Sequence, residues 1–476
     1  MRPAASHPRR ARPRSVGRPS ALVRGGSGAG PPAPVPAEAA PVRRARGQGR
    51  VLDWGLVRSL RLLFFSIGAS LGTFFPFVVV SLQSRGLGAA EIGIVTAAAA
   101  VAFALAVPVW GHLGDVTLGR VRALQVAAIL TTVIVLAYAA PLGALVAAVL
   151  IVVFSLFEAG FSPLSDAIAL ATVPDRTRDY ARVRLLTSLA FAIVSIACGF
   201  VFERTGYGVA AIPFAIAAAF ILLSTVRLRD VPRADLHAVV SGMPASPVAG
   251  PDGRRGLARL GSAGAALTVQ PRLPLVLVTI GLAHVAILAG FTFLPLRIVA
   301  LGGGASDVAL SAGIAALFEV PGMLVAGFVA SRVGLRGLFT LAVALYAACL
   351  LSWVVIDQPL GIAATRILTG LGFSGVAISS TLTIGSLLPA GLQATGQALM
   401  QTVAFGIAAV IADLFGGFIY AAGGPAPLFF VAAGAAGSAA VLGWAVFPRR
   451  GAAMVLEGAP VPSTVPAAER EMPFGG

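Results

Sequence analysis

The residues of this sequence that could do chemistry are ionisable side chains set inside long apolar runs. A charge in hydrocarbon costs at least about 2.5 kcal/mol, so each of them needs a partner or a wet cavity. A carboxyl group at that depth can also take up and release a proton, which is the simplest element of proton coupling. Seven side chains meet this description: Glu158, Asp166, Arg184, His284, Glu319, Arg366 and Asp413.

Asp166 and Arg184 lie near the same end of two consecutive apolar spans. Arg184 also continues one helical stripe through Ser188 and Ser195, and a polar stripe on a membrane helix faces protein or water. We therefore predict an ion pair between Asp166 and Arg184 on adjacent antiparallel helices. The pair could be a static contact between the helices, or it could take part in gating or substrate binding.

Glu158 and Glu319 each fall near the middle of a span. Either is a candidate carrier of a coupling proton, and the alternative is hydrogen bonding to neighbouring helices. Arg366 and Asp413 both lie in the outer part of their spans, so we expect them to pair. The alternative role for Arg366 is to bind an anionic group of a substrate.

Three further polar residues have two interpretations each. His284 could shuttle protons, but a lone histidine in an apolar helix is more often a packing residue. Gln397 and Gln401 share a helical face at i and i+4. Their amides could bind a solute that carries hydroxyl or amide groups, or they could form hydrogen bonds between helices.

The elements that must position these residues are helices that span a membrane. Hydrophobic residues make up 57% of the 476 and charged residues 11%, with a mean hydropathy of +0.91. Apolar runs of about 20 residues, enough to cross a bilayer as a helix, recur through most of the chain. The sequence predicts an all-α membrane protein with twelve transmembrane helices, at about 57–82, 88–112, 120–139, 142–170, 181–203, 207–227, 273–299, 307–331, 335–355, 359–386, 393–421 and 425–447.

Charge outside the spans predicts the topology and the domains. The net charge is +16, and every basic residue is an arginine. The arginines gather in the tails and at alternate span ends, which is typical of cytoplasmic segments rather than of nucleic-acid binding, so both termini are expected in the cytoplasm. We predict a disordered basic tail over 1–53, a six-helix bundle over 54–227, a cytoplasmic linker over 228–272, a second six-helix bundle over 273–447 and a cytoplasmic tail over 448–476.

The two predicted bundles repeat three local patterns. A duplicated six-helix unit implies two similar bundles that face each other, with a solute site between them. Gly160-Phe161-Ser162 returns as Gly372-Phe373-Ser374, Gly199-Phe200-Val201-Phe202 with Gly206 returns as Gly417-Phe418-Ile419-Tyr420 with Gly424, and the segment from Gly111 to Arg120 returns weakly as Gly327 to Arg336.

The loop after the second span holds a candidate conformational latch, formed by Gly111, Asp115, Gly119 and Arg120. Asp115 can meet the amino end of a neighbouring helix or an arginine. Such a contact forms in one state of a transport cycle and breaks in the other.

Enzyme, cofactor and metal motifs are not found in the sequence. It contains no Gly-rich phosphate loop that ends in Lys-Ser or Lys-Thr, and no His-Glu-x-x-His. Cys198 and Cys349 each lie inside an apolar span, so we interpret both as packing residues rather than metal ligands or disulfide partners. We therefore expect no enzymatic activity, no cofactor and no metal.

Several of these motifs resemble the major facilitator superfamily. The segment Gly111-His-Leu-Gly-Asp115-Val-Thr-Leu-Gly119-Arg120-Val-Arg122 looks like its loop between spans 2 and 3, with one extra residue and Val116 where a basic residue is usual. Four further segments resemble one branch of this superfamily more specifically. That branch contains phenylpropionate permease-like, lactose permease-like and nucleoside–proton symporter-like proteins. The segments are Pro163-Leu-Ser-Asp166-Ala167, Asp179-Tyr-Ala-Arg182-Val-Arg184-Leu-Leu-Thr-Ser188, Glu319-Val-Pro321 and Ala394-Thr-Gly-Gln397-Ala-Leu.

This resemblance covers residues 57 to 447 and implies transport by rocking of two six-helix halves, commonly with proton symport. It also implies that Asp166, Arg184, Glu319 and Gln397 occupy recurring motif positions. We predict a secondary active transporter that moves a small organic solute across the plasma membrane by alternating access, with protons as the coupling ion. The competing hypotheses are a proton-antiport exporter of drugs or sugars and a non-transporting membrane sensor or scaffold. We expect a monomer in the lipid bilayer of the cell membrane, without a nucleic-acid partner.

Overall fold

The computed structural model describes residues 54–173, 178–228 and 264–448, which form helices and short connections without a β-strand. The tail predicted over 1–53, all but the first residue of the tail predicted over 448–476, and most of the linker predicted over 228–272 lie outside these ranges. The division of the chain into two six-helix bundles stays a prediction.

The helices follow the apolar runs, because backbone polar groups in a bilayer must be satisfied within their own segment. The first set is α1 (Trp54–Phe74), η1 (Phe75–Phe77), α2 (Val78–Ser84), α3 (Ala89–His112), η2 (Leu113–Thr117), α4 (Arg120–Tyr138), α5 (Ala144–Glu158), α6 (Phe161–Thr172), α7 (Arg178–Thr205), η3 (Tyr207–Ala210) and α8 (Ala211–Thr225). The second set is α11 (Leu273–Ala300), α12 (Ala305–Val355), α13 (Pro359–Leu387), η4 (Ala390–Leu392), α14 (Gln393–Gln401), η5 (Thr402–Ile407), α15 (Ala408–Gly423) and α16 (Pro425–Val446).

The prediction of twelve spans is confirmed. Within the described ranges, 11 helices are long and apolar enough to cross a membrane. The longest, the 51-residue α12, contains Gly334 at φ 73° and ψ 175°, a conformation that interrupts the helix. The spans predicted over 307–331 and 335–355 lie on the two sides of this glycine, so α12 is two spans joined by a tight turn.

Six glycines in the described residues have a positive φ, and they form three pairs between the two helix sets. This conformation is costly for residues that carry a Cβ, so glycine is the residue that suits it. Two of the pairs belong to the patterns that repeat in the sequence, and the third follows the first span of each set. The pairs are Gly86 (φ 95°) with Gly302 (φ 83°), Gly119 (φ 85°) with Gly334 (φ 73°), and Gly206 (φ 77°) with Gly424 (φ 78°).

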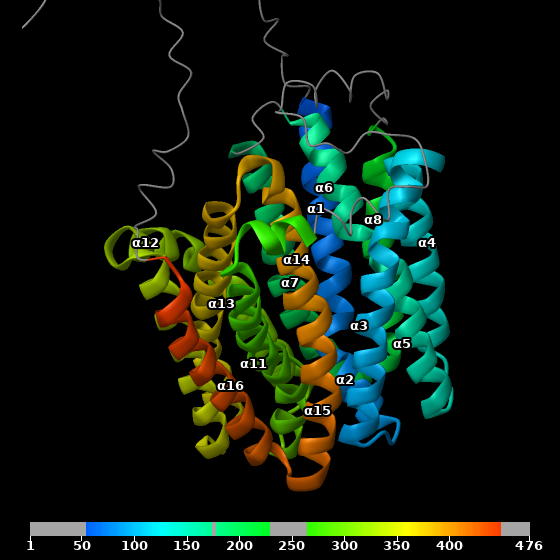
Figure 1. Ribbon diagram of the computed structural model, residues 1–476. Coiled ribbons are helices and arrows are strands. Elements are labelled where there is room, and N and C mark those ends of the chain that lie inside the picture. The colour runs from blue at the N-terminus through cyan, green and yellow to red at the C-terminus, as the bar shows by residue number, and fades with distance from the viewer. Residues whose placement is uncertain (1–53, 174–177, 229–263, 449–476) are drawn as a thin grey trace, which may run out of the picture. The chain divides into compact units, whose positions relative to one another are not determined.

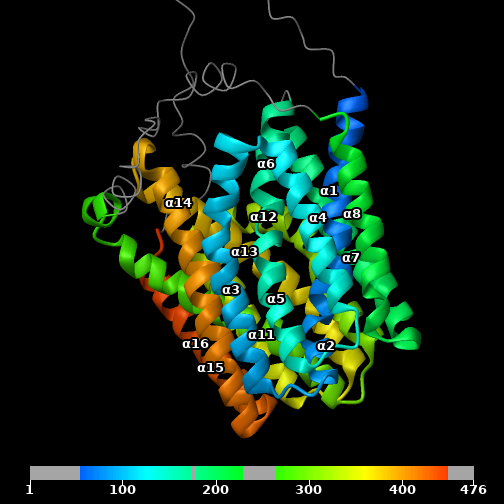
Figure 2. The same cartoon turned by 90° about the vertical axis from the view of Figure 1, so that its right-hand side faces the viewer.

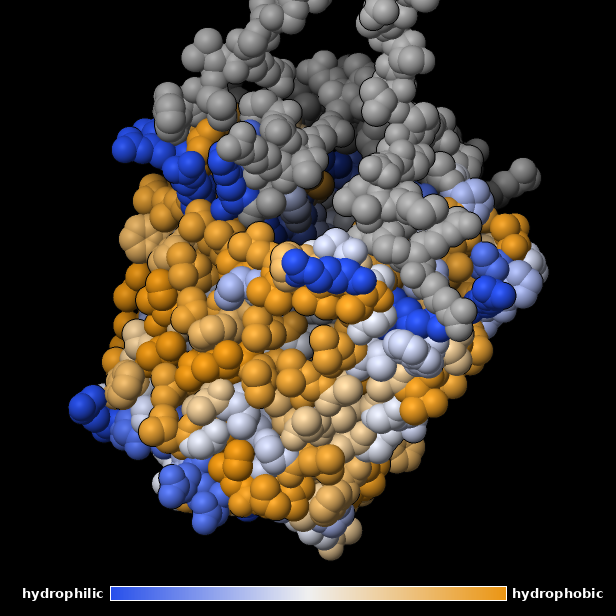
Figure 3. Space-filling model, turned by 90° about the vertical axis from the view of Figure 1, so that its left-hand side faces the viewer, coloured by the Kyte–Doolittle hydropathy of each residue, from blue (hydrophilic) through white to orange (hydrophobic). Residues whose placement is uncertain are grey.

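The described helices expose an apolar surface. Large side chains such as Leu105, Leu145, Leu324 and Val441 are more than half exposed, as expected where lipid replaces water. On the face in Figure 3, apolar residues cover most of the middle, and hydrophilic residues gather mainly towards the upper and lower edges. This pattern fits a multi-pass membrane protein.

The two helix sets touch along two seams. The helix α3 packs beside α15, and α7 packs beside α12 (Figures 1 and 2). Arg184 lies near the start of α7, whereas Glu203 lies near its end and contacts the start of α12. The two residues therefore mark opposite ends of the bundle. We call them the Glu203 end and the Arg184 end.

Candidate functional site

Two adjoining cavities lie between the helix sets. The first, of about 350 Å³, is lined from α1, η1, α2, α3, α5, α11, α12, α13, η5 and α15. The second, of about 380 Å³, extends between α7, α11, α12 and α13. Pockets of this size accept a small organic molecule. The two cavities share six lining residues: Phe75, Leu288, Phe291, Ala312, Arg366 and Phe405.

Arg366 and Glu319 are the charged residues that line the second cavity. The side chain of Arg366 is 6% exposed, and its Nε donates a hydrogen bond to the Ser311 carbonyl at 3.3 Å. Glu319 lies within electrostatic range of the guanidinium. The two helices can place these groups together because Gly370 has no side chain: a Cβ there would lie 3.2 Å from the Glu319 nitrogen.

The predicted pairing of Arg366 with Asp413 is wrong. No ion pair joins these two residues in the part of the chain that the structure describes. Arg366 lies on α13 and faces Ser311 and Glu319 of α12, because α12 and α13 pack together along most of their length. Asp413 lies on α15, which packs on α3 and α11 instead. Both residues still border the first cavity.

Asp413 and Glu158 are buried carboxyl groups that line the first cavity. Thr292 Oγ1 donates a hydrogen bond to Asp413 Oδ1 at 2.7 Å, and Thr96 on α3 borders the same cavity. Asp413 thus lies between helices of both sets. Glu158 lies at the end of α5, where the helix breaks at Ala159 and Gly160 before α6 begins. Both positions suit a group that exchanges a proton in a protected cavity.

The helix sets are in close contact at the Glu203 end. A Cβ on Gly93 of α3 would meet the Asp413 carbonyl oxygen and lie 2.8 Å from the Gly417 Cα of α15. The carboxylate of Glu203, on α7, accepts hydrogen bonds from the Ser306 backbone nitrogen at 2.9 Å and from its hydroxyl at 3.2 Å. Because Ser306 is in the first turn of α12, Glu203 places a negative charge at that helix amino end. These contacts hold the two helix sets together at the Glu203 end.

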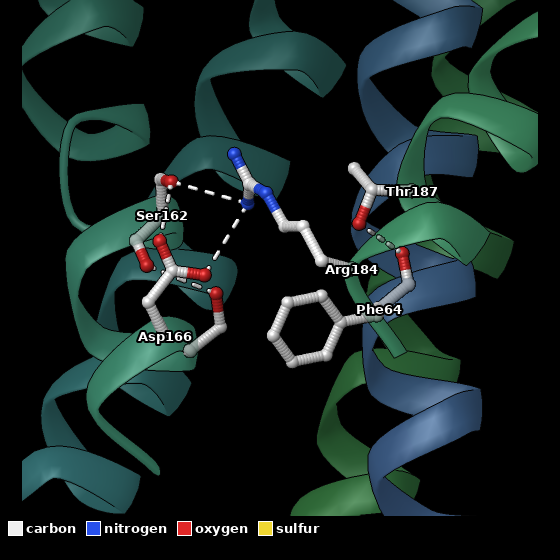
Figure 4. A network of polar contacts seen from close by, with 6 residues as sticks. Phe64, Ser162, Asp166, Arg184 and Thr187 are labelled. Carbon is white, nitrogen blue, oxygen red and sulfur yellow. Dashed lines mark hydrogen bonds and ion pairs between the residues drawn. The ribbon is translucent and has the colours of Figure 1, made fainter. Parts of the chain in front are cut away.

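Asp166 and Arg184 form the predicted ion pair, with Arg184 Nη1 3.3 Å from Asp166 Oδ1 (Figure 4). Ser162 joins the network, since its hydroxyl lies 3.3 Å from the same Arg184 nitrogen and 3.2 Å from Asp166 Oδ2. The Arg184 side chain is 44% exposed and that of Asp166 is 26% exposed. The pair is therefore partly hydrated and can break at low cost.

Tyr180 adds to this network just before the apolar part of α7. Burial raises the pKa of its hydroxyl to about 12, and the nearby negative charge of Asp166 adds to the rise. The hydroxyl therefore keeps its proton beside Asp166. Asp166 is held by Ser162 and Arg184, with Tyr180 nearby, at the Arg184 end.

In the candidate latch, the Asp115 carboxylate lies close to an arginine. Asp115 Oδ1 lies 2.9 Å from Arg120 Nη2 and accepts a hydrogen bond from Arg120 Nε at 2.9 Å. Gly119 has the positive φ that lets α4 begin directly after this loop, and Arg120 also reaches the Ala167 carbonyl at 3.4 Å. Of the two predicted partners for Asp115, the arginine is present.

His284, Gln397 and Gln401 are not among the residues that line the two cavities. The His284 ring is buried against Phe405, and its Nδ1 lies 2.8 Å from the Ile280 carbonyl. Gln397 donates a hydrogen bond to the Thr381 carbonyl at 2.9 Å, and Gln401 is exposed. These contacts favour the packing interpretation of His284 and the helix-contact interpretation of Gln397.

Sequence reasoning missed the aromatic residues of the cavities and the role of Glu203. Phe75, Phe291 and Phe405 are three of 27 phenylalanines, and nothing in their sequence context separates them from those that face lipid. A signal for Glu203 does exist. It ends an apolar span, and the Gly-Gly-Gly run before Ser306 leaves room for an incoming side chain.

A twelve-span helical protein whose central cavities carry a few charged groups is a secondary transporter by its architecture. The chain belongs to the MFS_1 like family, whose model matches residues 57–431. It is thereby a transporter of the major facilitator type, embedded in a membrane and acting on a small molecule.

Individual relatives agree with this assignment. The chain is 29% identical over 377 residues to the maltose permease of Geobacillus stearothermophilus, across 78% of this chain and 90% of that protein. It is 34% identical over 169 residues to a probable 3-phenylpropionic acid transporter of Escherichia coli, across 35% of this chain and 44% of that protein. The crystal structure of the nucleoside transporter NupG has the same fold, with a TM-score of 0.65 and 16% identity over 83% of this chain and 100% of that chain.

Proposed function

We propose that this protein is a proton-coupled symporter that takes up a small organic solute through the two adjoining cavities. The observation that carries the proposal is the position of Glu319 and Arg366 on neighbouring helices at the border of one cavity. A carboxyl group beside a fixed cation can hold either its proton or its charge, which is what a coupling site requires.

In this mechanism the bundles predicted over 54–227 and 273–447 rock about the cavities. The Glu203 end is the outer end, and both termini lie in the cytoplasm of a monomer in the cell membrane. The closed contacts at the Glu203 end then describe a state with access from the cytoplasm. Closure of the opposite end would involve the latch around Asp115 and the pair of Asp166 with Arg184.

The names of the relatives offer three solute classes: a disaccharide, an aromatic acid and a nucleoside. Labelled maltose, 3-phenylpropionate and uridine are therefore the first compounds to test in proteoliposomes with an imposed proton gradient. We expect the gradient to drive accumulation of one of them beyond its external concentration. Liposomes without protein measure passive entry, which is significant for weak acids.

The variant Glu319→Gln tests the coupling residue. An amide resembles the protonated carboxyl group but cannot release a proton, so accumulation against a concentration gradient should be lost while exchange of internal for external solute continues. The variant Asp357→Asn changes an exposed acidic residue in the loop between α12 and α13. It is the matched control, and it should accumulate the solute normally. Normal proton-driven accumulation by Glu319→Gln would remove Glu319 from the coupling mechanism.

A further inference from the structure

One nitrogen of Arg366 has no hydrogen-bond partner although it is buried. Its Nε donates a hydrogen bond to the Ser311 carbonyl, the Tyr346 hydroxyl lies within electrostatic range of the guanidinium, and the guanidinium lies 5.8 Å from the centre of the Trp353 ring. Nη1 is the unpartnered atom. A buried donor on a charged group is costly without an acceptor, and Arg366 borders both cavities. The side chain is therefore held in place by three neighbours, with one donor left for a ligand.

Three hydroxyl groups around the first cavity already donate hydrogen bonds within the protein. The hydroxyls of Thr96 and Ser155 donate to carbonyl oxygens one turn earlier in their own helices, at 3.0 Å and 3.1 Å. Thr292 donates to Asp413. A disaccharide needs many donors and acceptors around its whole surface, and each one left unmatched weakens binding.

Aromatic rings supply most of the remaining wall. Six phenylalanines border the first cavity, and three of them also border the second. A flat apolar ring buries well among such side chains, with edge and face contacts that add to the hydrophobic gain. The six are Phe74, Phe75, Phe103, Phe154, Phe291 and Phe405.

We infer that the solute is an aromatic monocarboxylate, whose carboxylate accepts a hydrogen bond from Arg366 Nη1 and whose ring packs on Phe75, Phe291 and Phe405. Charge-assisted contacts between arginine and a carboxylate are among the strongest hydrogen bonds in proteins. The inference rests on the proposed transport function and names its solute.

Charge balance then links the solute to the proton. In the empty site the Glu319 carboxylate is the counter-charge of Arg366. When Glu319 takes up a proton, the carboxylate of the solute replaces it, so the site holds no net charge either with both ligands or with neither. Glu158 and Asp413 border the first cavity and not the second, and the exchange between Glu319 and the solute does not involve them.

Binding of radiolabelled 3-phenylpropionate to the purified full-length protein in nanodiscs tests the inference. We expect saturable binding that unlabelled 3-phenylpropionate competes for. The neutral amide 3-phenylpropanamide, which has the same shape, should compete at least about tenfold more weakly, because it lacks the charge that strengthens the contact with Arg366. Maltose and uridine should not compete. Equal competition by acid and amide, or displacement by maltose, would overturn the inference.

Two variants separate the carboxylate contact from folding. Arg366→Gln should weaken 3-phenylpropionate binding about 10- to 100-fold, whereas Arg297→Gln, a control at a part-buried arginine that does not line the cavities, should not. Because Arg366→Gln can fail to fold, Glu319→Gln is the second variant. It should bind 3-phenylpropionate with an affinity that no longer falls as the pH rises, because the exchange with a Glu319 proton is lost. A pH dependence like that of the unmodified protein would contradict the exchange of carboxylates.

The same preparations distinguish this inference from the proposed function. If a proton gradient drives maltose or uridine accumulation while 3-phenylpropionate neither binds nor competes, the solute inference is overturned and the transport function stands. If 3-phenylpropionate binds in an Arg366-dependent manner and the gradient drives no accumulation, the solute inference stands and the proposed proton coupling is wrong.

Discussion

A side chain at Gly93 should force open the seam between α3 and α15 at the Glu203 end. A Cβ at this position meets backbone atoms, which cannot rotate away as a side chain would. To move from 2.8 Å to the 3.4 Å or more of ordinary contact with the Gly417 Cα, the two helices must separate. The variant Gly93→Val therefore destabilises the state in which these helices touch, and it affects a state in which they are apart much less.

The size of the effect follows from the cost of overpacking. Forcing extra methyl groups into a tight contact costs about 1–3 kcal/mol. When that cost falls on one of two states, each 1.4 kcal/mol changes their ratio about tenfold. We expect Gly93→Val to raise the population open at the Glu203 end about 5- to 100-fold, up to the point where that state dominates.

Thiol labelling measures this population directly. The two native cysteines, Cys198 and Cys349, are buried and can be replaced by alanine. Ala312 lines both cavities, so Ala312→Cys reports access to them. A membrane-impermeant maleimide applied from the Glu203 side should label this cysteine faster in Gly93→Val. Gly434→Val, at an exposed helix position where a Cβ meets nothing within 4 Å, is the control and should leave the rate unchanged. If Gly93→Val is folded and its labelling rate equals that of the control, the seam does not close the cavities.

Three further predictions concern single polar contacts. Glu203→Gln should also raise labelling from the Glu203 side, by about two- to fivefold, because a negative charge at a helix amino end is worth about 0.3–1 kcal/mol; an unchanged rate would show that the contact with α12 is not state-dependent. In a double-mutant cycle of Asp166→Asn and Arg184→Gln, the coupling in the free energy of unfolding should be at most about 1 kcal/mol, since the pair is partly exposed; a value of several kcal/mol would mean that it is dry in the membrane. Asp115→Asn should change transport rate and probe accessibility with little effect on solute affinity, and a loss of affinity at unchanged accessibility would exclude the latch.

Much of the fold was predictable because membrane spans have a strong signal. Each span is a long apolar run, and the turns between spans carry glycine or arginine, so the number of helices and their approximate bounds follow from composition alone. Gly119 and Gly334 are examples, since the repeated glycine–arginine pattern already marked both turns before their positive φ was known. Local chemistry was sufficient for these features.

The site was less predictable because it depends on how the helices rotate and pack. The pairing of Asp166 with Arg184 was found, since their spans are consecutive and antiparallel. Arg366 was assigned the wrong partner because depth in the membrane says nothing about which helix faces which. Glu319 lies beside Arg366 only because Gly370 lets α12 and α13 approach closely. Nothing in the sequence distinguishes this glycine from the rest of the 56, so the close approach could not be predicted.

The glycines of the repeated sequence patterns also relate residues of the first helix set to residues of the second. Phe103 stands eight residues before Gly111, as Glu319 stands before Gly327. Likewise, Phe154 stands six residues before Gly160, as Arg366 stands before Gly372. Both phenylalanines line the first cavity, and Arg366 lines it from the opposite half. Where the second helix set has two charged residues, the first has two aromatic rings. Two identical halves could not distinguish the two ends of a solute, whereas in the proposed site the charged half would receive the carboxylate and the aromatic half the ring.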